Sequence, residues 1–208
     1  MTGHPSGATT PAVRPTIAGL VLAAGASRRM GRPKALLALD ASGVTFARAV
    51  CDRLTMAAIS PIVVVTRADL RDALAAALPG IGLVVNPDPD RGQLSSLLTG
   101  LDVVGPCDAV LVTLVDLPLF QPSTVTALVA QWRATRAPLV RPVHEGRNGH
   151  PAIFGRALLD ALQAADTTAG AKPVIGRFLA DAVSVPVDDP GTVDDIDTPE
   201  AYDRLTRA

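Results

Sequence analysis

Three short segments made almost wholly of apolar residues constrain the fold more than any other feature of the chain. They are residues 17–23, 62–66 and 109–115. A strand that is buried on both faces is a continuous apolar run, whereas a strand with one face in water alternates apolar and polar residues. All three segments are of the continuous kind, so they predict central strands of a parallel sheet that is covered on both faces.

Segments with helical spacing of their apolar residues alternate with the strand-like ones. The expected helices are residues 44–58, 69–78, 94–103, 122–135, 158–165 and 174–180, and a last one from Pro199. Shorter strands are expected at residues 83–85, 139–142, 153–154 and 183–187, and loops at residues 86–92, 144–150 and 188–197. This order predicts an α/β fold in which a mostly parallel, twisted sheet carries helices on both faces. Ligands of such folds bind at the carboxyl ends of the strands.

Composition limits the classes of protein to which the chain can belong. Its 208 residues are enough for one large α/β domain. Hydrophobic residues make up 48% and charged residues 19%, which supplies a sizeable core and excludes global disorder. The net charge of -1 argues against a surface that binds nucleic acid or an anionic membrane. Any site for a phosphate must therefore be a local one.

The first residues and the cysteines bear on location. Residues 1–16 are rich in Gly, Pro, Ser and Thr and lack the apolar segment of a signal peptide, so we expect a disordered tail followed by one domain over residues 17–208. No apolar run approaches the roughly 20 residues that a membrane span requires. Cys51 and Cys107 lie in apolar segments and form no C-x-x-C pair. Buried, reduced thiols and a cytoplasmic location are therefore expected.

The segment after the first predicted strand combines small residues with cations. The chain breaks at Gly25 and then passes Arg28, Arg29 and Lys34. Small residues allow backbone N–H groups to approach an anion closely, and nearby cations neutralise it. Residues 17–34 therefore favour a loop that wraps the phosphates of a nucleotide. The alternative is an ordinary strand-to-helix turn with a solvated basic rim.

A carboxylate stands at the end of the most apolar predicted strand. Asp116 follows residues 109–115 and precedes Pro118 within two residues. Magnesium prefers hard oxygen ligands, often one or two carboxylates together with substrate phosphates. The position favours a Mg²⁺ ligand over the alternative, an Asp that caps the following turn.

A second acidic segment could reach the same ion. Capping of a helix that starts at Pro199 can explain Asp197 or Thr198. Capping does not explain Asp195, which is therefore the candidate for a second metal ligand, with Asp197 left as an open alternative.

Two further loops carry polar groups that could contact a ligand. Ser95 and Ser96 open a predicted helix, where backbone N–H groups and hydroxyls can hold a phosphate or a base edge; a plain N-cap needs only one of them. Gly149 and His150 lie in a polar loop next to Pro151. His150 could donate a hydrogen bond to a substrate or anchor its own turn.

Together these residues resemble the nucleotidyltransferases of molybdenum cofactor biosynthesis, the MobA-like NTP transferase family, and in particular its cytidylyltransferase branch. The resemblance covers about residues 17–205, and its most specific part is residues 22–34, L-A-A-G-A-S-R-R-M-G-R-P-K, which is similar to the opening signature of the family. The supporting matches, in chain order, are residues 92–96, Asp116 with Pro118, and residues 149–151, 170–172 and 195–200.

The resemblance implies a single Rossmann-like, three-layer domain of the nucleotide-diphospho-sugar transferase type. It implies an enzyme that transfers CMP from CTP to the phosphate of molybdopterin and releases pyrophosphate, with Mg²⁺ as cofactor. A molybdoenzyme or a maturation protein is an implied partner, whereas nucleic acid and membranes are not.

The resemblance also assigns roles to residues. Those that would contact the nucleotide are Leu22, Ala23, Ala24, Gly25, Ser27, Arg28, Lys34, Ser95 and Ser96. The catalytic ones would be Lys34, Arg28 and Asp116, with Asp116 and Asp195 on the metal and Gly149 and His150 towards the acceptor.

The choice of nucleotide and acceptor has alternatives. Ala24 is similar to cytidylyltransferases, because guanylyltransferases of the family more often carry Gly there. GTP as donor, or a sugar phosphate as acceptor, would keep the same chemistry. A nucleotide-binding partner or chaperone without turnover is an alternative of another class, and it would not need Asp116. A dinucleotide-binding oxidoreductase is disfavoured, because the loop lacks G-x-G-x-x-G spacing.

Overall fold

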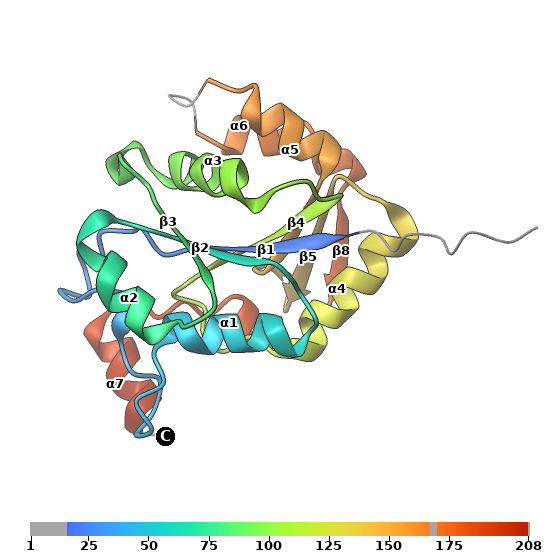
Figure 1. Cartoon of the computed structure of the whole chain (residues 1–208). Helices are drawn as coiled ribbons and strands as arrows, with labels where there is room; N and C mark the ends of the chain where they lie inside the picture. The colour runs from blue at the N-terminus through green and yellow to red at the C-terminus, as the bar shows by residue number, and fades with distance from the viewer. Residues whose placement is uncertain (1–15, 167–169, 208) are drawn as a thin grey trace, which may run out of the picture.

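The computed structural model describes residues 16–166 and 170–207. These form a three-layer α/β domain around one twisted sheet (Figure 1). Its strands are β1 (Ile17–Leu22), β2 (Ile62–Thr66), β3 (Gly82–Val85), β4 (Ala109–Leu114), β5 (Leu139–His144), β6 (Arg147–Asn148), β7 (Ala152–Gly155) and β8 (Val183–Pro186). Its α-helices are α1 (Phe46–Met56), α2 (Arg71–Ala77), α3 (Gln93–Val104), α4 (Pro122–Thr135), α5 (Arg156–Gln163), α6 (Lys172–Gly176) and α7 (Pro199–Arg207).

The sheet has the strand order β3-β2-β1-β4-β7-β5-β6, with β8 paired to β5. Four of its pairs are parallel, namely β1 with β2, β1 with β4, β2 with β3, and β5 with β8. β7 runs antiparallel between β4 and β5. Since the chain leaves β1 towards β2 on one side and reaches β4 on the other, the order reverses between β1 and β4. A crevice at the carboxyl ends of these two strands is where such sheets bind ligands.

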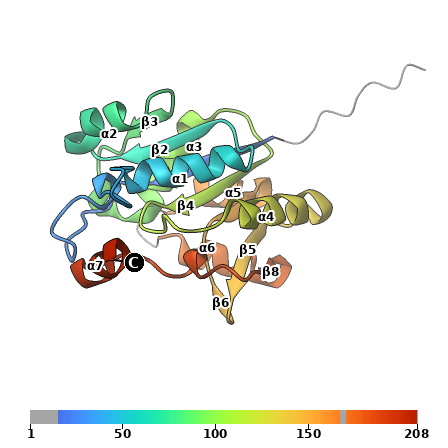
Figure 2. The same cartoon turned by 90° about the horizontal axis from the view of Figure 1, so that it is seen from below.

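Two apolar layers hold the helices against the sheet. On one face, β1 and β4 pack against α1 and α4 through side chains such as Val50, Leu54 and Leu128. On the other face, Leu20 and Val112 pack against α3 and α5. Figure 1 shows α3, α5 and α6 on one side of the sheet and α1, α2 and α4 on the other. Figure 1 shows α7 on the side of the sheet opposite α5 and α6, and the view turned by 90° shows α7 beside the loop that follows β1 (Figure 2).

The predicted α/β class, the mostly parallel sheet and the covering helices are confirmed. The three apolar runs are β1, β2 and β4, and all side chains of β2 are buried. Two local predictions are wrong. The expected loop at residues 144–150 is partly a hairpin, because β5 continues to His144 and pairs with β6. The expected helix at residues 174–180 begins earlier and is shorter, as α6, and a 3-10 turn (Leu179–Asp181) follows it.

Two further predictions concern membrane spans and the cysteines. Within the described residues, no helix is long and apolar enough to cross a membrane. Cys51 and Cys107 are both free, Cys51 buried and Cys107 of intermediate exposure. Burial raises the pKa of the Cys51 thiol to about 12, so it is neutral at physiological pH. The predicted tail, residues 1–16, lies outside the described residues except for Thr16.

Candidate active site

A pocket of about 260 Å³ opens where the strand order reverses. Most of the predicted nucleotide-contacting residues line it, namely Leu22, Ala23, Ala24, Gly25, Ser27, Lys34 and Ser96, together with Asp116. Leu22 ends β1, and Asp116 follows β4 by two residues, so adjacent parallel strands deliver both groups to one edge of the sheet. The sequence-predicted loop and the strand-end carboxylate thus form one site.

The loop after β1, residues 23–34, is held mainly by hydrogen bonds among its own residues. The carbonyl oxygen of Ser27 accepts hydrogen bonds from the backbone N–H groups of Met30 and Gly31, at 3.1 and 3.0 Å. The hydroxyl of Ser27 accepts one from the backbone N–H of Lys34, at 3.1 Å. Met30 is buried and anchors the loop in the core. We call residues 23–34 the opening loop.

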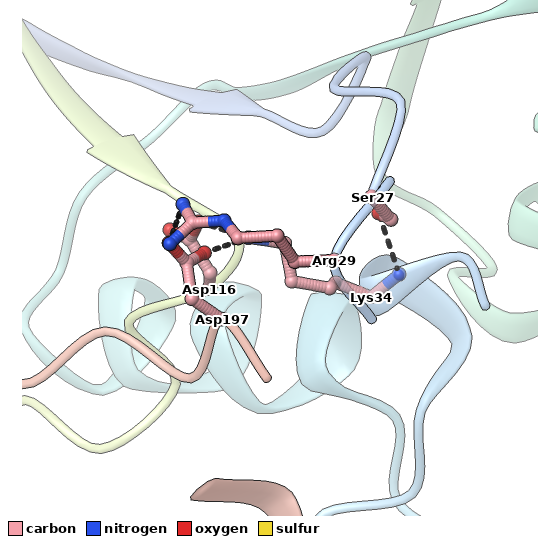
Figure 3. A network of polar contacts seen from close by, with 5 residues as sticks. All are labelled: Ser27, Arg29, Lys34, Asp116 and Asp197. Atoms are coloured by element: carbon pink, nitrogen blue, oxygen red, sulfur yellow. Dashed lines mark hydrogen bonds and ion pairs between the residues drawn. The ribbon is translucent and has the colours of Figure 1, made fainter. Parts of the chain in front are cut away.

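Lys34 is the centre of a polar network (Figure 3). Its Nζ donates to Asp116 Oδ2 at 2.5 Å and also to Asp197 Oδ1. The second oxygen of Asp197 accepts from the guanidinium of Arg29. The three interior side chains are less than a fifth exposed, with 13% for Lys34, 19% for Asp116 and 16% for Asp197. This burial strengthens the attraction between the opposite charges.

The network fixes the charge of its members. Burial alone would lower the pKa of Lys34, but its hydrogen bonds to Asp116 and Asp197 and their charges outweigh burial and raise that pKa. For Asp197, burial opposes ionisation, but the hydrogen bond and charge of Lys34 outweigh it and lower the pKa. At neutral pH Lys34 is therefore an ammonium ion, and Asp197, one of its two partners, is an ionised carboxylate.

The second acidic segment, residues 188–197, reaches the site through a backbone contact, and we call it the acidic loop. The N–H of Ile196 donates to the carbonyl oxygen of Asp116 at 2.9 Å, which brings both neighbours of Ile196 beside Asp116. Burial, with the hydrogen bond and charge of Asp197 and the charge of Asp116, raises the pKa of Asp195.

Sequence reasoning left Asp197 only as an alternative metal ligand and missed its contact with Lys34, because capping of α7 could explain the residue. In the structure Thr198 supplies the cap, since its Oγ1 accepts from the backbone N–H of Ala201 at 3.3 Å. Asp197 is thereby free to bind Lys34 and Arg29. The sequence did carry a signal for this role. Asp197 and Thr198 were two candidates for one capping position, so one of them was left for another contact.

The two predicted serines differ in position. Ser96 lines the pocket and is buried, whereas Ser95 does not line it. Asn86 donates its side-chain amide to both hydroxyls, at 2.9 Å for Ser95 and 3.0 Å for Ser96. Ser95 also donates to the carbonyl oxygen of Gly92 at 2.8 Å. Both serines therefore help to hold the loop after β3 onto the start of α3.

The remaining predicted residues lie outside this pocket. The side chain of Arg28 is 85% exposed, and its guanidinium lies 3.9 Å from Asp90. His150 lies behind β4, with Nδ1 3.3 Å from the carbonyl oxygen of Val112, and burial lowers its pKa. Gly149 touches the acidic loop: a Cβ there would lie 2.3 Å from the carbonyl oxygen of Thr192.

The carboxylates suit a hard divalent cation. Asp116 Oδ1 is buried and has no hydrogen-bond partner, although Oδ2 of the same group is bound to Lys34. An unpartnered buried carboxylate oxygen is costly unless a cation or donor meets it. Within residues 16–166 and 170–207, no group of three or more His, Cys, Asp or Glu is arranged to hold a metal ion. The donor set therefore fits a metal ion that is bound by one or two carboxylates and by the phosphates of a substrate.

Comparisons with known proteins identify the family of the chain. The family described as "MobA-like NTP transferase domain" matches residues 19–183. A probable molybdenum cofactor guanylyltransferase of Natronomonas pharaonis is 33% identical over 71% of this chain and 75% of its own length. Nicotine blue oxidoreductase of Paenarthrobacter nicotinovorans is 32% identical over 92% of this chain and 97% of its own.

A solved structure extends the likeness to three dimensions. Rv0371c of Mycobacterium tuberculosis H37Rv has a TM-score of 0.80 and 28% identity, and the match covers 93% of this chain and 98% of that one. A manganese complex of Rv0371c gives 0.74 and 26%, with 93% and 99% covered. With its switch-point pocket, opening loop and strand-end carboxylate, the chain belongs to the MobA-like NTP transferase family and is a nucleotidyltransferase.

Proposed function

We propose that the protein transfers CMP from CTP to the phosphate of molybdopterin and releases pyrophosphate. The observation that carries the proposal is the Lys34 ammonium, bound by Asp116 and Asp197 at the wall of the pocket. A buried cation next to carboxylates, beneath a loop of small residues, can align a triphosphate and neutralise the charge that spreads over it.

The reaction itself asks little covalent chemistry of the protein. An oxygen of the acceptor phosphate attacks the α-phosphorus of the nucleotide and forms a new P–O bond. The bond from that phosphorus to the oxygen bridging the β-phosphate breaks, and pyrophosphate leaves with the electron pair. A phosphate monoester has a second pKa of about 6, so the acceptor is already ionised at neutral pH and needs no strong general base.

Residues of the pocket supply the alignment. Backbone groups of Leu22 to Gly25, beside Ser27 and Ser96, would contact the nucleoside. Lys34 would exchange Asp197 for the phosphates and would stabilise the departing pyrophosphate, since its raised pKa keeps it protonated. Arg28, at the exposed rim, would add charge attraction once the triphosphate is bound. Gly149 and His150 would lie on the acceptor side, with Ser95 supporting Ser96 through Asn86.

The proposed cofactor is Mg²⁺, held by Asp116 and Asp195. The unpartnered Oδ1 of Asp116 supports this, as does the manganese complex of the mycobacterial relative. When bound, the ion would neutralise negative charge on the α-phosphate.

The choice of CTP over GTP rests on Ala24, a buried residue that lines the pocket, because guanylyltransferases of the family more often carry Gly at this position. GTP is the second candidate, because the archaeal relative is named a guanylyltransferase. The same pocket is also compatible with a sugar phosphate as acceptor, or with nucleotide binding without turnover.

The test is to incubate the purified protein with Mg²⁺ and each of the four NTPs, with and without molybdopterin, and to measure pyrophosphate. Release that is selective for CTP and depends on molybdopterin is the expected result. Release with GTP alone would replace the nucleotide, and release with a sugar phosphate alone would replace the acceptor. Nucleotide binding without any release, across a panel of phosphorylated acceptors, would contradict turnover.

A further inference from the structure

The acidic loop runs along the loop after β4, residues 115–121, in the opposite direction. The N–H of Ile196 donates to the carbonyl oxygen of Asp116 at 2.9 Å. Earlier in the acidic loop, a Cβ on Gly191 would lie 2.4 Å from the carbonyl carbon of Leu119, so here backbone rests directly on backbone. As the acidic loop is followed back from Ile196, its contacts therefore move along the loop after β4 towards the start of α4.

Asp189 makes the last contact in this series. It is 3% exposed, and its Oδ2 accepts from the backbone N–H of Gln121 at 2.7 Å and from the hydroxyl of Thr124 at 2.6 Å. Its own backbone N–H donates to Nδ1 of His144, at the end of β5, at 3.2 Å. Three segments that are far apart in the sequence therefore meet at this residue, namely β5, the start of α4 and the acidic loop.

The bond to Gln121 replaces one that α4 does not make for itself. Gln121 is the N-cap of α4, and its side chain makes no capping hydrogen bond. In a capping box, a Glu or Gln at the third helical position accepts from the backbone N–H of the N-cap residue. In α4 that position is Thr124, and its hydroxyl donates to Asp189 instead. Asp189 thus supplies from a remote loop the carboxyl group that this helix start lacks.

The surroundings of Asp189 hold its side chain in one place. The start of α4 carries the positive end of a helix dipole, which favours a carboxylate there. Burial lowers the pKa of Arg53 on α1, and the charge of Asp189 opposes that effect, so a cation also lies within its field. Because a buried carboxyl group that loses its donors is costly, this contact is strongly specified.

The chain between Asp189 and the carboxylates of the site is tied by hydrogen bonds of short range. The N–H and the hydroxyl of Thr192, which is fully buried, both donate to the carbonyl oxygen of Asp189, at 3.2 and 2.8 Å. The N–H of Asp194 donates to the carbonyl oxygen of Pro190 at 3.0 Å. Ile196 is 5% exposed and belongs to the core. A displacement of Asp189 would therefore be passed on to both neighbours of Ile196.

We propose that Asp189 is a positioning residue for nucleotidyl transfer, which holds the acidic loop in register with the loop after β4. It thereby sets the positions of Asp195 and Asp197 relative to Asp116. The pairing of Asp197 with Lys34 depends on the same register (Figure 3). Asp189 does not line the nucleotide pocket and acts only through these residues. Its effect on the metal rests on the proposed function, whereas its effect on the loop does not.

Hydrogen–deuterium exchange of the full chain, followed by mass spectrometry, measures the register without any ligand. Asp189→Ala should raise the exchange rates of amides in residues 190–198 about tenfold, because the loop opens more often without its buried anchor. Asp189→Asn keeps one acceptor oxygen and should give a smaller increase. Thr124→Val removes one of the two donors at nearly constant size, and it replaces Asp189→Ala in the test if that variant does not fold.

The structure offers a matched control in Asp108. Its Oδ2 accepts from the backbone N–H of Thr16 at 2.8 Å and from the hydroxyl of Thr16 at 3.3 Å, which are the same two kinds of donor. Asp108 precedes β4, however, whereas Asp116 follows it. Asp108→Asn should therefore leave the exchange of residues 190–198 as it is in the unchanged protein.

Binding of Mn²⁺ in the presence of CTP, followed by electron paramagnetic resonance, measures the consequence for the metal site. Asp189→Asn should raise the dissociation constant of Mn²⁺ about tenfold, as is typical for residues that orient metal ligands. Asp108→Asn should leave it unchanged. A high concentration of Mg²⁺ should restore the pyrophosphate release of Asp189→Asn, which it would not do if the variant had merely lost folded protein.

Two results would overturn the proposal. One is unchanged exchange of residues 190–198 in both Asp189→Asn and Thr124→Val. The other is faster exchange with unchanged affinity for Mn²⁺, which would make Asp189 a residue of stability alone. If the unchanged protein binds no Mn²⁺ in the presence of CTP, the metal site of the proposed function is wrong, and the exchange rates still decide whether Asp189 holds the loop.

Discussion

The opening loop and the acidic loop meet at Lys34, but they are built in different ways. The opening loop is held by hydrogen bonds among its own residues, from Ser27 to Met30, Gly31 and Lys34. The acidic loop also has hydrogen bonds of its own, such as that from the N–H of Thr192 to the carbonyl oxygen of Asp189, but remote segments position it against the site. The N–H of Ile196 donates to the carbonyl oxygen of Asp116, and the carbonyl oxygen of Thr192 accepts from the N–H of His150 at 2.9 Å. One loop is therefore a local structure, and the other depends on the rest of the fold.

This difference shows why similar charges carry different weight in the two loops. Lys34 is 13% exposed, and two carboxylates from other parts of the chain hold it. Arg28, six residues earlier in the same loop, is 85% exposed and lies 3.9 Å from one exposed partner. Water screens the second interaction and hardly the first. Two cations that are six residues apart in one loop thus differ in burial and in partners, and we predict that their contributions to turnover differ accordingly.

The largest effect is expected from Asp116→Ala, which removes the carboxylate that both loops share. Pyrophosphate release should fall by at least about 10³-fold, because the variant loses a proposed metal anchor and a partner of Lys34 together. The control is Asp102→Ala, an exposed carboxylate of α3. Turnover within a few-fold of the unchanged protein would remove Asp116 from its proposed role.

The dependence of the acidic loop on remote packing can be broken at Gly149. In Gly149→Ala, the new Cβ would meet the backbone oxygen of Thr192, so the free energy of unfolding should fall by about 1–3 kcal/mol. Gly176→Ala is the matched control, because a Cβ there meets nothing within 4 Å and alanine favours a helix. Urea denaturation measures the free energy of unfolding of both variants. Equal values for Gly149→Ala and Gly176→Ala would show that the close approach of Gly149 to Thr192 does not limit stability.

Within the acidic loop, substitutions of Asp195 and of Asp197 should have different effects on turnover. Asp195→Asn should raise the Mg²⁺ concentration for half-maximal turnover about tenfold, as expected for a weakened metal site. Asp197→Asn should leave that concentration within about threefold and instead lower kcat, since Lys34 and Arg29 lose their shared partner. Binding of Mn²⁺, followed by electron paramagnetic resonance, gives a readout independent of turnover. The reverse pattern would make Asp197 the metal ligand.

The smallest effect is expected from Arg28→Gln in the opening loop. The KM for the nucleotide should rise about threefold with kcat unchanged, because an exposed cation adds uniform, screened attraction. The difference from the unchanged protein should vanish in 0.5 M salt. A large loss of kcat that persists in high salt would place Arg28 in the reacting centre, against its exposed position.

Much of the fold could be predicted because its signals are local. A continuous apolar run such as β4 or β2 is legible in a few residues, and Pro122 marks the start of α4 as expected. The antiparallel direction of β7 could not be read in this way, because direction depends on which strand a segment finds as a neighbour. The β5–β6 hairpin was missed for another reason: its residues are polar and therefore suggested a loop.

The site divides along the same line. By itself, the sequence determined the small residues of the opening loop, its cations and the carboxylate after β4, because each is a neighbour in the chain of the strand that positions it. Only the tertiary structure decided that Lys34 binds both Asp116 and Asp197, and that Arg28 remains outside. The partners of Lys34 lie 82 and 163 residues away, and no local propensity encodes such a distance. Packing of the acidic loop against Asp116 and Gly149 brings Asp197 to Lys34. The pairing then stabilises both charges, since a buried charge without a partner of opposite sign is costly.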